Sequence, residues 1–296
     1  MIPFFLLPLK MNTNIVDPLE TEKRREFPVL HLILFLLTLG ATLVAGSLQQ
    51  GVNLIDNPED IWKGIPFSFT LILILGSHEF GHYFVSRMHG VRVTLPYFIP
   101  APSIIGTFGA FIKMKSPIMD RRTLLDIGVA GPLSGLAVTV PVLLFGLVLS
   151  EIVPVAPQAG LSLGSSLLFS FLNWIVHGTI PDHMDVMLHP VAFSGWIGLL
   201  VTSLNLLPVG QLDGGHVAYA IFGRRQRIIA ITIMALLVIL GLTAWPGWFF
   251  WAAFLLFIGV HHPPVIYDWI PLDRRRKRIG WLTLILFAAT FTPKPF

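Results

Sequence analysis

Two histidines and a glutamate lie within five consecutive residues of an otherwise apolar stretch. His78, Glu79 and His82 belong to the sequence Gly-Ser-His-Glu-Phe-Gly-His. Residues four apart share one face of a helix, so the two imidazoles can bind a single metal ion. Glu79 lies one residue round from His78, where its carboxylate can hold and deprotonate a metal-bound water. The spacing therefore predicts a zinc site with an adjacent general base.

The alternative is that these three side chains only hydrogen-bond to one another inside a helix bundle. Ionised carboxylates are costly inside a membrane, and those that occur there usually mark a functional site. Glu79 lies within a long apolar stretch. The functional interpretation is therefore favoured over the structural one.

A second cluster offers the third protein ligand that a catalytic zinc site requires. The chain has no cysteine, so any metal must bind His, Asp, Glu or Asn. Asp213 is the best candidate, because Pro208, Gly210 and the pair Gly214-Gly215 break the helical pattern around it. Irregular backbone at membrane depth is tolerated only where it is buried in protein or lines a wet cavity. Taken alone, Asp213 fits equally well as the cap of a helix that begins near Gly215.

The elements that must hold these residues are apolar. Of the 296 residues, 54% are hydrophobic and only 12% are charged, and the mean hydropathy is +0.75. Soluble proteins carry charge on about a quarter of their residues, so these few charges could not cover a soluble domain of this size. The composition predicts an integral membrane protein and argues against a cytosolic enzyme.

Seven apolar stretches are candidates for membrane-spanning helices, because a bilayer core about 30 Å thick needs roughly 20 helical residues. The last of them has only 13 residues and is either a marginal span or an interfacial helix. We expect an all-α polytopic membrane protein with about six or seven transmembrane helices. The stretches are Val29–Leu48, Ile65–Ser86, Leu124–Ser150, Val191–Pro208, Ile228–Ala244, Gly247–Val260 and Ile279–Phe291.

Lysine and arginine follow the distribution expected of a protein whose N-terminus is cytoplasmic. All but Lys63 and Lys294 of the 20 basic residues fall into four groups, which then share one side of the membrane. Basic charge is therefore a topology signal, and we expect no nucleic-acid partner. The apolar segment Leu161–Val176 is interpreted as re-entrant or interfacial, since a crossing there would separate the basic groups. Residues 1–27 are expected to form a cytoplasmic tail, and residues 28–296 a single membrane-embedded domain.

The two motifs together resemble the site-2 protease family of intramembrane zinc metalloproteases. The second motif, Asn205–Gly214, has the pattern N-x-x-P-x-x-x-x-D-G, and the segments Gly106–Phe111 and Ala130–Gly135 also resemble the core of that family. The similarity covers about residues 65–222, which is expected to be the catalytic core. The segment Glu151–Pro190 is too short for a PDZ insertion, so the branch without that insertion is expected.

The resemblance implies a role for each site residue. His78, His82 and Asp213 would bind one Zn²⁺ per chain, and Glu79 would act as the general base. Asn205 would help to position the substrate or the developing oxyanion. The implied reaction is hydrolysis of a peptide bond within or near the transmembrane segment of a membrane-protein substrate, as in regulated intramembrane proteolysis.

The segment Val91–Ser116, between the second and third apolar stretches, has the composition of strands. Its β-branched and aromatic residues are interrupted by Pro96, Pro100 and Pro102. We expect a small membrane-associated β-hairpin whose edge accepts a substrate strand. The alternative is an ordinary cytoplasmic loop.

Two other classes of function remain as alternatives. A divalent-metal transporter would use the same His and carboxylate ligands, but it would need polar residues along a path to both faces. A catalytically silent scaffold for membrane partners is the third possibility. We expect the lipid bilayer and a transmembrane protein or peptide as partners, and a bacterial-type inner (cell) membrane as the location.

Several small or ionisable residues are expected to have structural roles. His216, three residues beyond Asp213, can contact the metal ligands, but helix packing is favoured. His261 and His262 are expected at the membrane interface. Gly131 and Gly135 fit a close contact between two helices.

Overall fold

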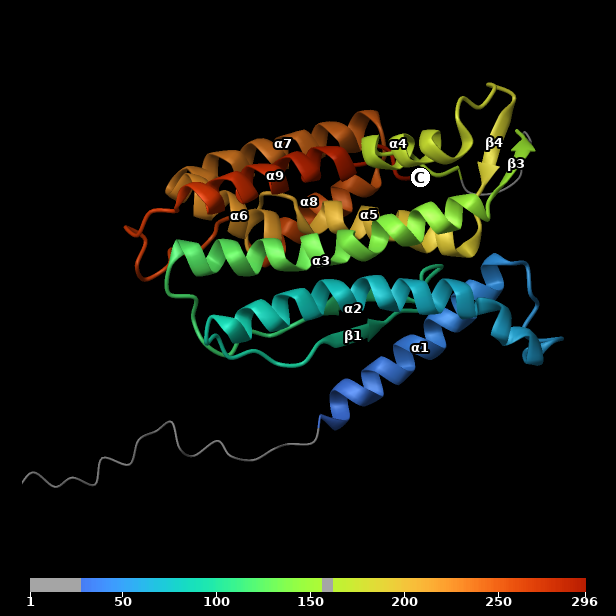
Figure 1. Ribbon diagram of the computed structural model, residues 1–296, viewed down its shortest axis with the longest axis horizontal. Helices are drawn as coiled ribbons and strands as arrows, with labels where there is room; N and C mark the ends of the chain where they lie inside the picture. Colours follow the sequence, from blue (N-terminus) through green and yellow to red (C-terminus); the bar gives the residue numbers. More distant parts are fainter. Residues whose placement is uncertain (1–27, 156–161) are drawn as a thin grey trace, which may run out of the picture.

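The computed structural model describes residues 28–155 and 162–296 and is mostly helical (Figure 1). The predicted tail, residues 1–27, lies outside the described residues. The helices are α1 (Val29–Gln49), α2 (Ile65–Met88), α3 (Arg121–Val148), α4 (Leu167–His177), α5 (Pro190–Asn205), α6 (Asp213–Phe222), α7 (Gln226–Thr243), α8 (Gly247–Ile258) and α9 (Arg274–Thr290). Two short 3₁₀-helices, η1 (Pro58–Gly64) and η2 (Gly223–Arg225), join them. The strands are β1 (Tyr97–Pro100), β2 (Thr107–Phe111), β3 (Glu151–Pro154) and β4 (Met184–Met187).

Within the described residues, four helical stretches are long and apolar enough to cross a membrane. They are α1, η1 with α2, α3, and the continuous run from α6 through η2 to α7. Three further apolar helices, α4, α5 and α8, have 11, 16 and 12 residues. The protein is therefore an integral membrane protein with a mostly helical fold, and the predicted count of six or seven spans is not confirmed.

The last helix begins earlier than the sequence suggested. Its predicted start at Ile279 excluded the preceding cationic run, yet α9 begins at Arg274. The carboxylate of Asp273 caps this start by accepting a hydrogen bond from the backbone N–H of Arg276, at 2.9 Å. The guanidinium of Arg276 also donates to Asp126 on α3, at 2.6–3.1 Å. The first turn of α9 is basic rather than apolar, and it is stabilised by this cap and this ion pair.

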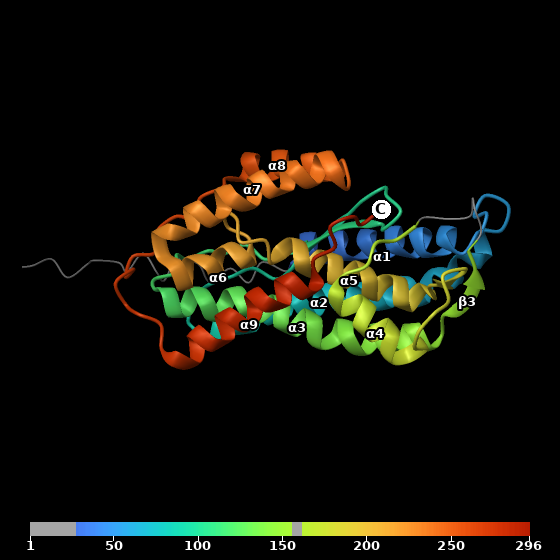
Figure 2. The same cartoon turned by 90° about the horizontal axis from the view of Figure 1, so that it is seen from above.

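Helices α2, α3 and α5 pack together, and α2 runs alongside α3 (Figure 1). A Cβ atom placed on Gly146 of α3 would lie 2.3 Å from the backbone nitrogen of Ala192 on α5. The hydroxyls of Thr70 and Ser194 join α2 to α5 at 2.5 Å. Close backbone approach and buried hydroxyl pairs are typical contacts between membrane helices. Figure 2 shows α7 and α8 projecting from the layer that these helices form.

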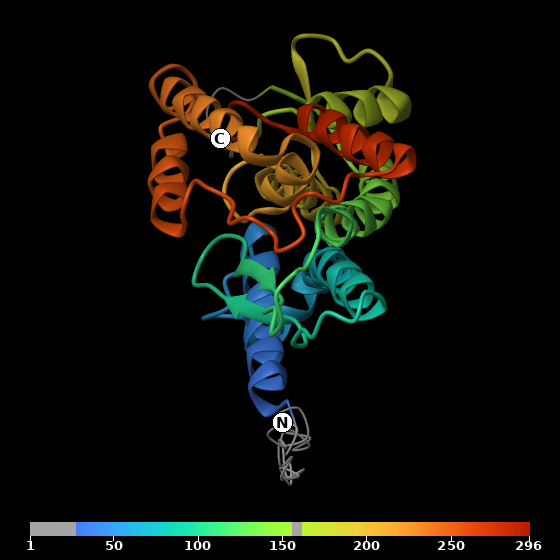
Figure 3. The same ribbon diagram turned by 90° about the vertical axis from the view of Figure 1, so that its left-hand side faces the viewer.

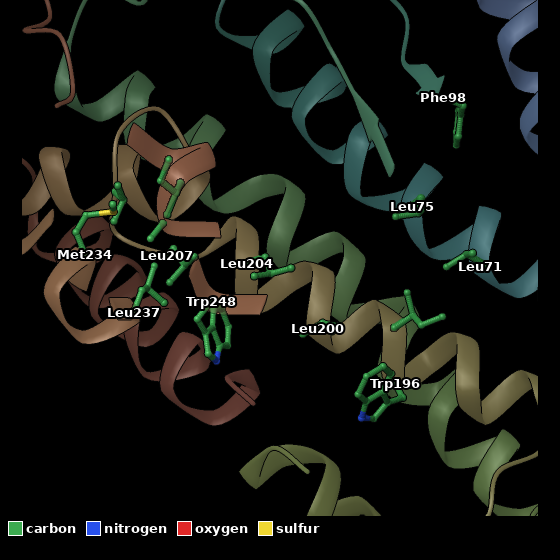
Figure 4. Packing of buried hydrophobic residues seen from close by; sticks show 14 of the residues in the cluster. Leu71, Leu75, Phe98, Trp196, Leu200, Leu204, Leu207, Met234, Leu237 and Trp248 are labelled. Carbon is green, nitrogen blue, oxygen red and sulfur yellow. The ribbon is translucent and has the colours of Figure 1, made fainter. Parts of the chain in front are cut away.

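A buried apolar cluster joins this layer to the projecting helices. Its members come from α1, α2, β1, α5, α7, α8 and the loop after α5, and several are labelled in Figure 4. Trp248 of α8 is fully buried, and its indole N–H donates to the carbonyl of Pro293 at 2.7 Å. Leu207, in the loop after α5, is 1% exposed within the same cluster. The loop that follows Asn205 is therefore anchored in the core.

The predicted hairpin between the second and third apolar stretches is present. Strands β1 and β2 pair antiparallel, with Tyr97 opposite Phe111 and Ile99 opposite Gly109. The sheet lies beside α1 (Figure 3), and the ring of Tyr97 stacks on His31 of that helix at 4.0 Å. Of the two strands, helix α1 packs mainly against β1, so β2 lies farther from that helix.

The segment between α3 and α5 contains structure that the sequence did not predict. Strands β3 and β4 form a second two-stranded antiparallel sheet, with Glu151 opposite Met187. Helix α4, capped by Ser166, covers most of the segment predicted to be re-entrant or interfacial. At 1.5 Å per residue its 11 residues extend about 17 Å, which is too short to cross a bilayer core.

The close approach of α3 and α5 leads to a stability prediction. Gly146→Ala places a methyl group against the backbone of Ala192, which cannot move without shifting a whole helix. We expect the variant to unfold at a lower temperature in detergent, with a loss of about 1–3 kcal/mol typical of overpacking. Gly40→Ala in α1 is the matched control, because a Cβ there meets nothing within 4 Å. Identical unfolding midpoints for the two variants would contradict this account of the packing.

Candidate metal centre

Helix α2 carries three ionisable side chains on its buried part. His78, Glu79 and His82 are 5%, 6% and 7% exposed. Pro66 stands in the first turn of α2, and the helix continues unbroken to Met88. Helical geometry therefore puts both imidazoles on one face, one turn apart, with Glu79 beside them.

The loop between α5 and α6 brings Asp213 to the same place. A Cβ on Gly214 would lie 1.9 Å from the carbonyl oxygen of Leu206, and one on Gly215 would lie 2.3 Å from that of Gly210. Only glycine allows the loop to fold back so tightly on the start of α6. Helix α6 begins at Asp213 itself, and no side-chain hydrogen bond caps it. The carboxylate is therefore not used as a helix cap, which was the alternative role predicted for it.

Three atoms from the two elements form a nearly equilateral triangle. His78 Nε2 and His82 Nε2 are 3.2 Å apart, and each is 3.2 Å from Asp213 Oδ2. Zinc bonds of 2.0–2.1 Å in tetrahedral geometry place ligand atoms roughly 3.3 Å from one another. The three side chains also form the metal-ligand cluster found among the described residues. Their spacing and chemistry therefore fit a zinc ion.

Hydrogen bonding on the far side of His82 favours metal binding. Its Nδ1 lies 2.8 Å from the backbone carbonyl of Ile127 on α3. A carbonyl oxygen only accepts, so Nδ1 carries the proton and Nε2 keeps its lone pair. A carbonyl or carboxylate that orients a ligating histidine in this way is common in metal sites.

Glycines on one face of α3 make room for the imidazoles. A Cβ on Gly131 would lie 2.0 Å from His82 Nε2, and one on Gly135 would lie 3.2 Å from His78 Nδ1. Gly128, one turn earlier, faces the Cβ of His216 at 2.9 Å in the same construction. The predicted close helix contact at Gly131 and Gly135 is present, and its partners are the two histidine side chains of α2.

A cavity of about 490 Å³ opens beside the three ligand atoms. Asn205, the last residue of α5, reaches this cavity, and its Nδ2 lies 3.4 Å from His78 Nε2. The β-hairpin and the segment after it form the opposite wall. The lining residues are His78, Glu79, His82, Ala110, Phe111, Ile112, Lys113, Met114, Ile127, Asn205, Gln211, Leu212, Asp213 and His216. All five site residues predicted from the sequence therefore line one cavity.

Two further histidines near the cavity were assigned other roles from the sequence. His216 lines the cavity, and its Nδ1 is 2.8 Å from Nε2 of His262. His262, which was expected at the membrane interface, packs against α6. No spacing pattern could have paired it with His216, because 45 residues, including α7 and α8, separate the two histidines in the sequence.

Comparisons with known proteins find relatives that are named as probable zinc metalloproteases. The chain is 30% identical over 249 residues to the probable zinc metalloprotease EGY2, chloroplastic, of Arabidopsis thaliana. The aligned region covers 81% of this chain and 44% of that protein. It is 30% identical over 298 residues to the probable zinc metalloprotease EGY1, chloroplastic, of the same plant, with 90% and 53% covered. For EGY1 of Oryza sativa subsp. japonica the identity is 33% over 224 residues, with 66% and 38% covered. The chain thus spans about half the length of the curated relatives it matches.

A family model covers the part of the chain that holds the cavity. The model of Peptidase family M50 matches residues 66–243, which is more than half of the chain. Its match includes α2, the hairpin, α3, α5 and the loop that leads to Asp213. The chain therefore belongs to Peptidase family M50, the site-2 protease family that its two motifs resemble.

Proposed function

We propose that this chain is a zinc-dependent endopeptidase that cuts a peptide bond within or near the transmembrane segment of a membrane protein. The main support is the triangle of ligand atoms, 3.2 Å on each side, next to the buried carboxyl group of Glu79. Membership of Peptidase family M50 and relatives named as probable zinc metalloproteases add to it.

In this proposal each site residue has one task. His78, His82 and Asp213 hold one zinc ion per chain, which when bound lowers the pKa of a water and polarises the scissile carbonyl. Glu79 accepts the proton of the attacking water and passes it to the leaving nitrogen. Asn205, whose amide is 3.4 Å from His78 Nε2, donates a hydrogen bond to the substrate carbonyl or the developing oxyanion.

The hairpin holds the substrate segment in an extended form. A transmembrane helix hides its carbonyl groups in internal hydrogen bonds, so the segment must unwind before attack. Among the described residues β2 pairs with β1 alone, and residues 110–114, at its end and beyond, line the cavity. A substrate strand added to β2 recovers backbone hydrogen bonds beside the metal ligands.

The orientation in the membrane follows from the basic residues. We propose a cytoplasmic N-terminus, six or seven spans and cleavage near the cytoplasmic side, since the four basic groups then share one face. Release of regulators from membranes is the physiological role proposed with it. We keep the bacterial-type inner membrane only as a proposal, since the relatives reported above are named chloroplastic proteins.

The transporter interpretation has no support in the comparisons. The family model is that of a peptidase family, and the relatives reported above are named as probable metalloproteases. The peptidase is therefore the only function proposed.

Replacing the general base gives the most direct test. Glu79→Gln should reduce hydrolysis of a transmembrane reporter in detergent by a factor of about 10²–10⁴, the usual contribution of a general base. Zinc content, measured by elemental analysis, should stay at one ion per chain. Glu151→Gln, which changes an exposed carboxylate of β3, is the control. Full cleavage by the Glu79 variant would rule out the proposed function.

The glycine face of α3 provides a test of the metal site that leaves every ligand in place. Gly131→Ala puts a methyl carbon 2.0 Å from His82 Nε2, so the imidazole must leave its present position beside Asp213. We expect zinc affinity to fall by about 10- to 100-fold, as for residues that orient metal ligands. The matched control is Gly40→Ala, in open space on α1. Unchanged zinc binding in the Gly131 variant would contradict the proposed ligand set.

A proline in the hairpin tests strand addition. Gly109 has φ +102°, and its N–H donates to Thr107 Oγ1 at 2.9 Å. Proline fits neither feature, so Gly109→Pro should distort β2 and lower cleavage while zinc content is kept. Gly178→Pro is the control, because it removes a similar left-handed glycine (φ +69°) from the segment after α4. Equal cleavage rates in the two variants would argue against strand addition.

A further inference from the structure

The segment that follows α8 packs on the loop that carries Asp213. We call residues 259–263 the strap. The backbone N–H of Gly210 donates to the carbonyl of Val260 at 2.9 Å, and a Cβ on Gly210 would lie 2.2 Å from the carbonyl oxygen of Gly259. Backbone therefore meets backbone at the turn between Asn205 and Asp213, with no side chain between them.

A buried glutamine ties the strap to the same loop a second time. Gln226 is 1% exposed, and its Nε2 donates to the carbonyl of Pro208 at 3.3 Å. Its Oε1 accepts from the backbone N–H of His262 at 3.4 Å. The side-chain amide of Gln226 thus joins the strap to the loop and fixes the position of the His262 backbone.

The side chain of His262 then reaches the wall of the cavity. Its ring stacks on Tyr219 of α6, with ring centres 4.5 Å apart and planes inclined by 24°. Its Nε2 lies 2.8 Å from Nδ1 of His216. Tyr219 is itself held by a hydrogen bond from its hydroxyl to Asp268, at 3.1 Å. The position of His262 is thus determined by a stacking contact on one face and a hydrogen bond at one edge.

These contacts decide which ring nitrogens carry protons. The Nδ1 of His262 lies 2.5 Å from the carbonyl oxygen of Pro263, which can only accept, so Nδ1 is protonated. Burial lowers the pKa of His262, so its ring is neutral at pH 7 and its Nε2 is an acceptor. His216 must then donate from Nδ1, which in the neutral imidazole leaves its Nε2 unprotonated.

We propose that His216 is a further substrate-binding residue and that His262 is its positioning residue, an inference that rests on the proposed peptidase function. The unprotonated Nε2 of His216 accepts a hydrogen bond from a backbone N–H of the extended substrate segment. His216 lines the cavity together with Glu79 and Asn205, and its ring hydrogen bond to another described residue is made by Nδ1 and not by Nε2. The strap lies beyond residue 243, where the family match ends, and thus extends the site beyond it.

Two substitutions at residue 262 separate hydrogen bonding from packing. His262→Phe keeps an aromatic ring on Tyr219 and removes the acceptor that His216 needs. His262→Gln loses the ring and keeps an amide oxygen near the position of Nε2. The neighbouring His261→Phe, which changes an exposed side chain, is the control. Each full-length protein is purified in detergent, and kcat/KM on a transmembrane reporter is expressed per zinc-loaded molecule.

We expect kcat/KM to fall about tenfold in His262→Phe and to stay within about threefold of wild type in His262→Gln, as is usual for residues that orient site groups. The zinc content and the unfolding midpoint of His262→Phe should match those of His261→Phe. Full activity in His262→Phe would overturn the inference. So would a loss in His262→Gln alone, or a loss in both variants that follows their zinc content, because the strap would then serve packing only.

The tautomer can be read without any cleavage. In protein labelled with ¹⁵N-histidine, the imidazole nitrogen shifts of wild type should show His216 protonated at Nδ1, and His262→Phe should lose that state. A proton on Nε2 of His216 in wild type would overturn the inference even if the enzyme is active. A zinc-loaded wild-type protein that leaves the reporter uncut would instead contradict the proposed function, so the two failures are distinguishable.

Discussion

The rest of the site depends on one electrostatic constraint. An imidazole nitrogen of His78, one of His82 and a carboxylate oxygen of Asp213 lie 3.2 Å from one another inside the protein. Three groups that offer lone pairs repel one another unless a cation or a proton lies between them, and low polarity strengthens that repulsion. The carbonyl of Ile127 keeps the proton of His82 on the far nitrogen. A divalent cation is the species that satisfies all three groups at once.

The side chains of the metal site can meet only because neighbouring positions are glycines, which have no side chain to fill the space. Gly131 and Gly135 of α3 leave the space that the imidazoles of α2 fill, and Gly214 lets the loop after α5 fold back so that Asp213 starts α6. That loop is irregular backbone, which is tolerated among apolar helices when it is fully packed. It is packed by Leu207 in the core, by Gln226 and by the strap. The loop that carries Asp213 is therefore fixed by buried packing and hydrogen bonds although it is not helical.

Local periodicity was enough to predict the parts of the site that lie close together in sequence. The spacing of His78 and His82 needs only a helix, and the prolines and glycines around Asp213 mark the break that turns its carboxylate inward. The family was identified correctly from these two motifs, whereas the metal-binding and catalytic roles stay predictions. Sheet β3–β4 could not be predicted, because its strands have only four residues each and pair across 29 intervening residues. The contact of His262 with His216 was missed for the same reason, since tertiary packing alone creates it.

Peptide hydrolysis at membrane depth also needs replacement partners for the backbone of the substrate. Each backbone group released from a helix into hydrocarbon costs several kcal/mol unless it finds another hydrogen bond. Unwinding a few residues would therefore be prohibitive in lipid alone. The edge of β2 offers backbone hydrogen-bonding groups, although its pairing is irregular opposite Ile99 and Pro100, and the cavity beside it is lined by Asn205 and His216. In the proposed function, substrate unwinding and substrate alignment would be the same event, because the backbone groups that leave the helix would be bound beside the carboxylate of Glu79.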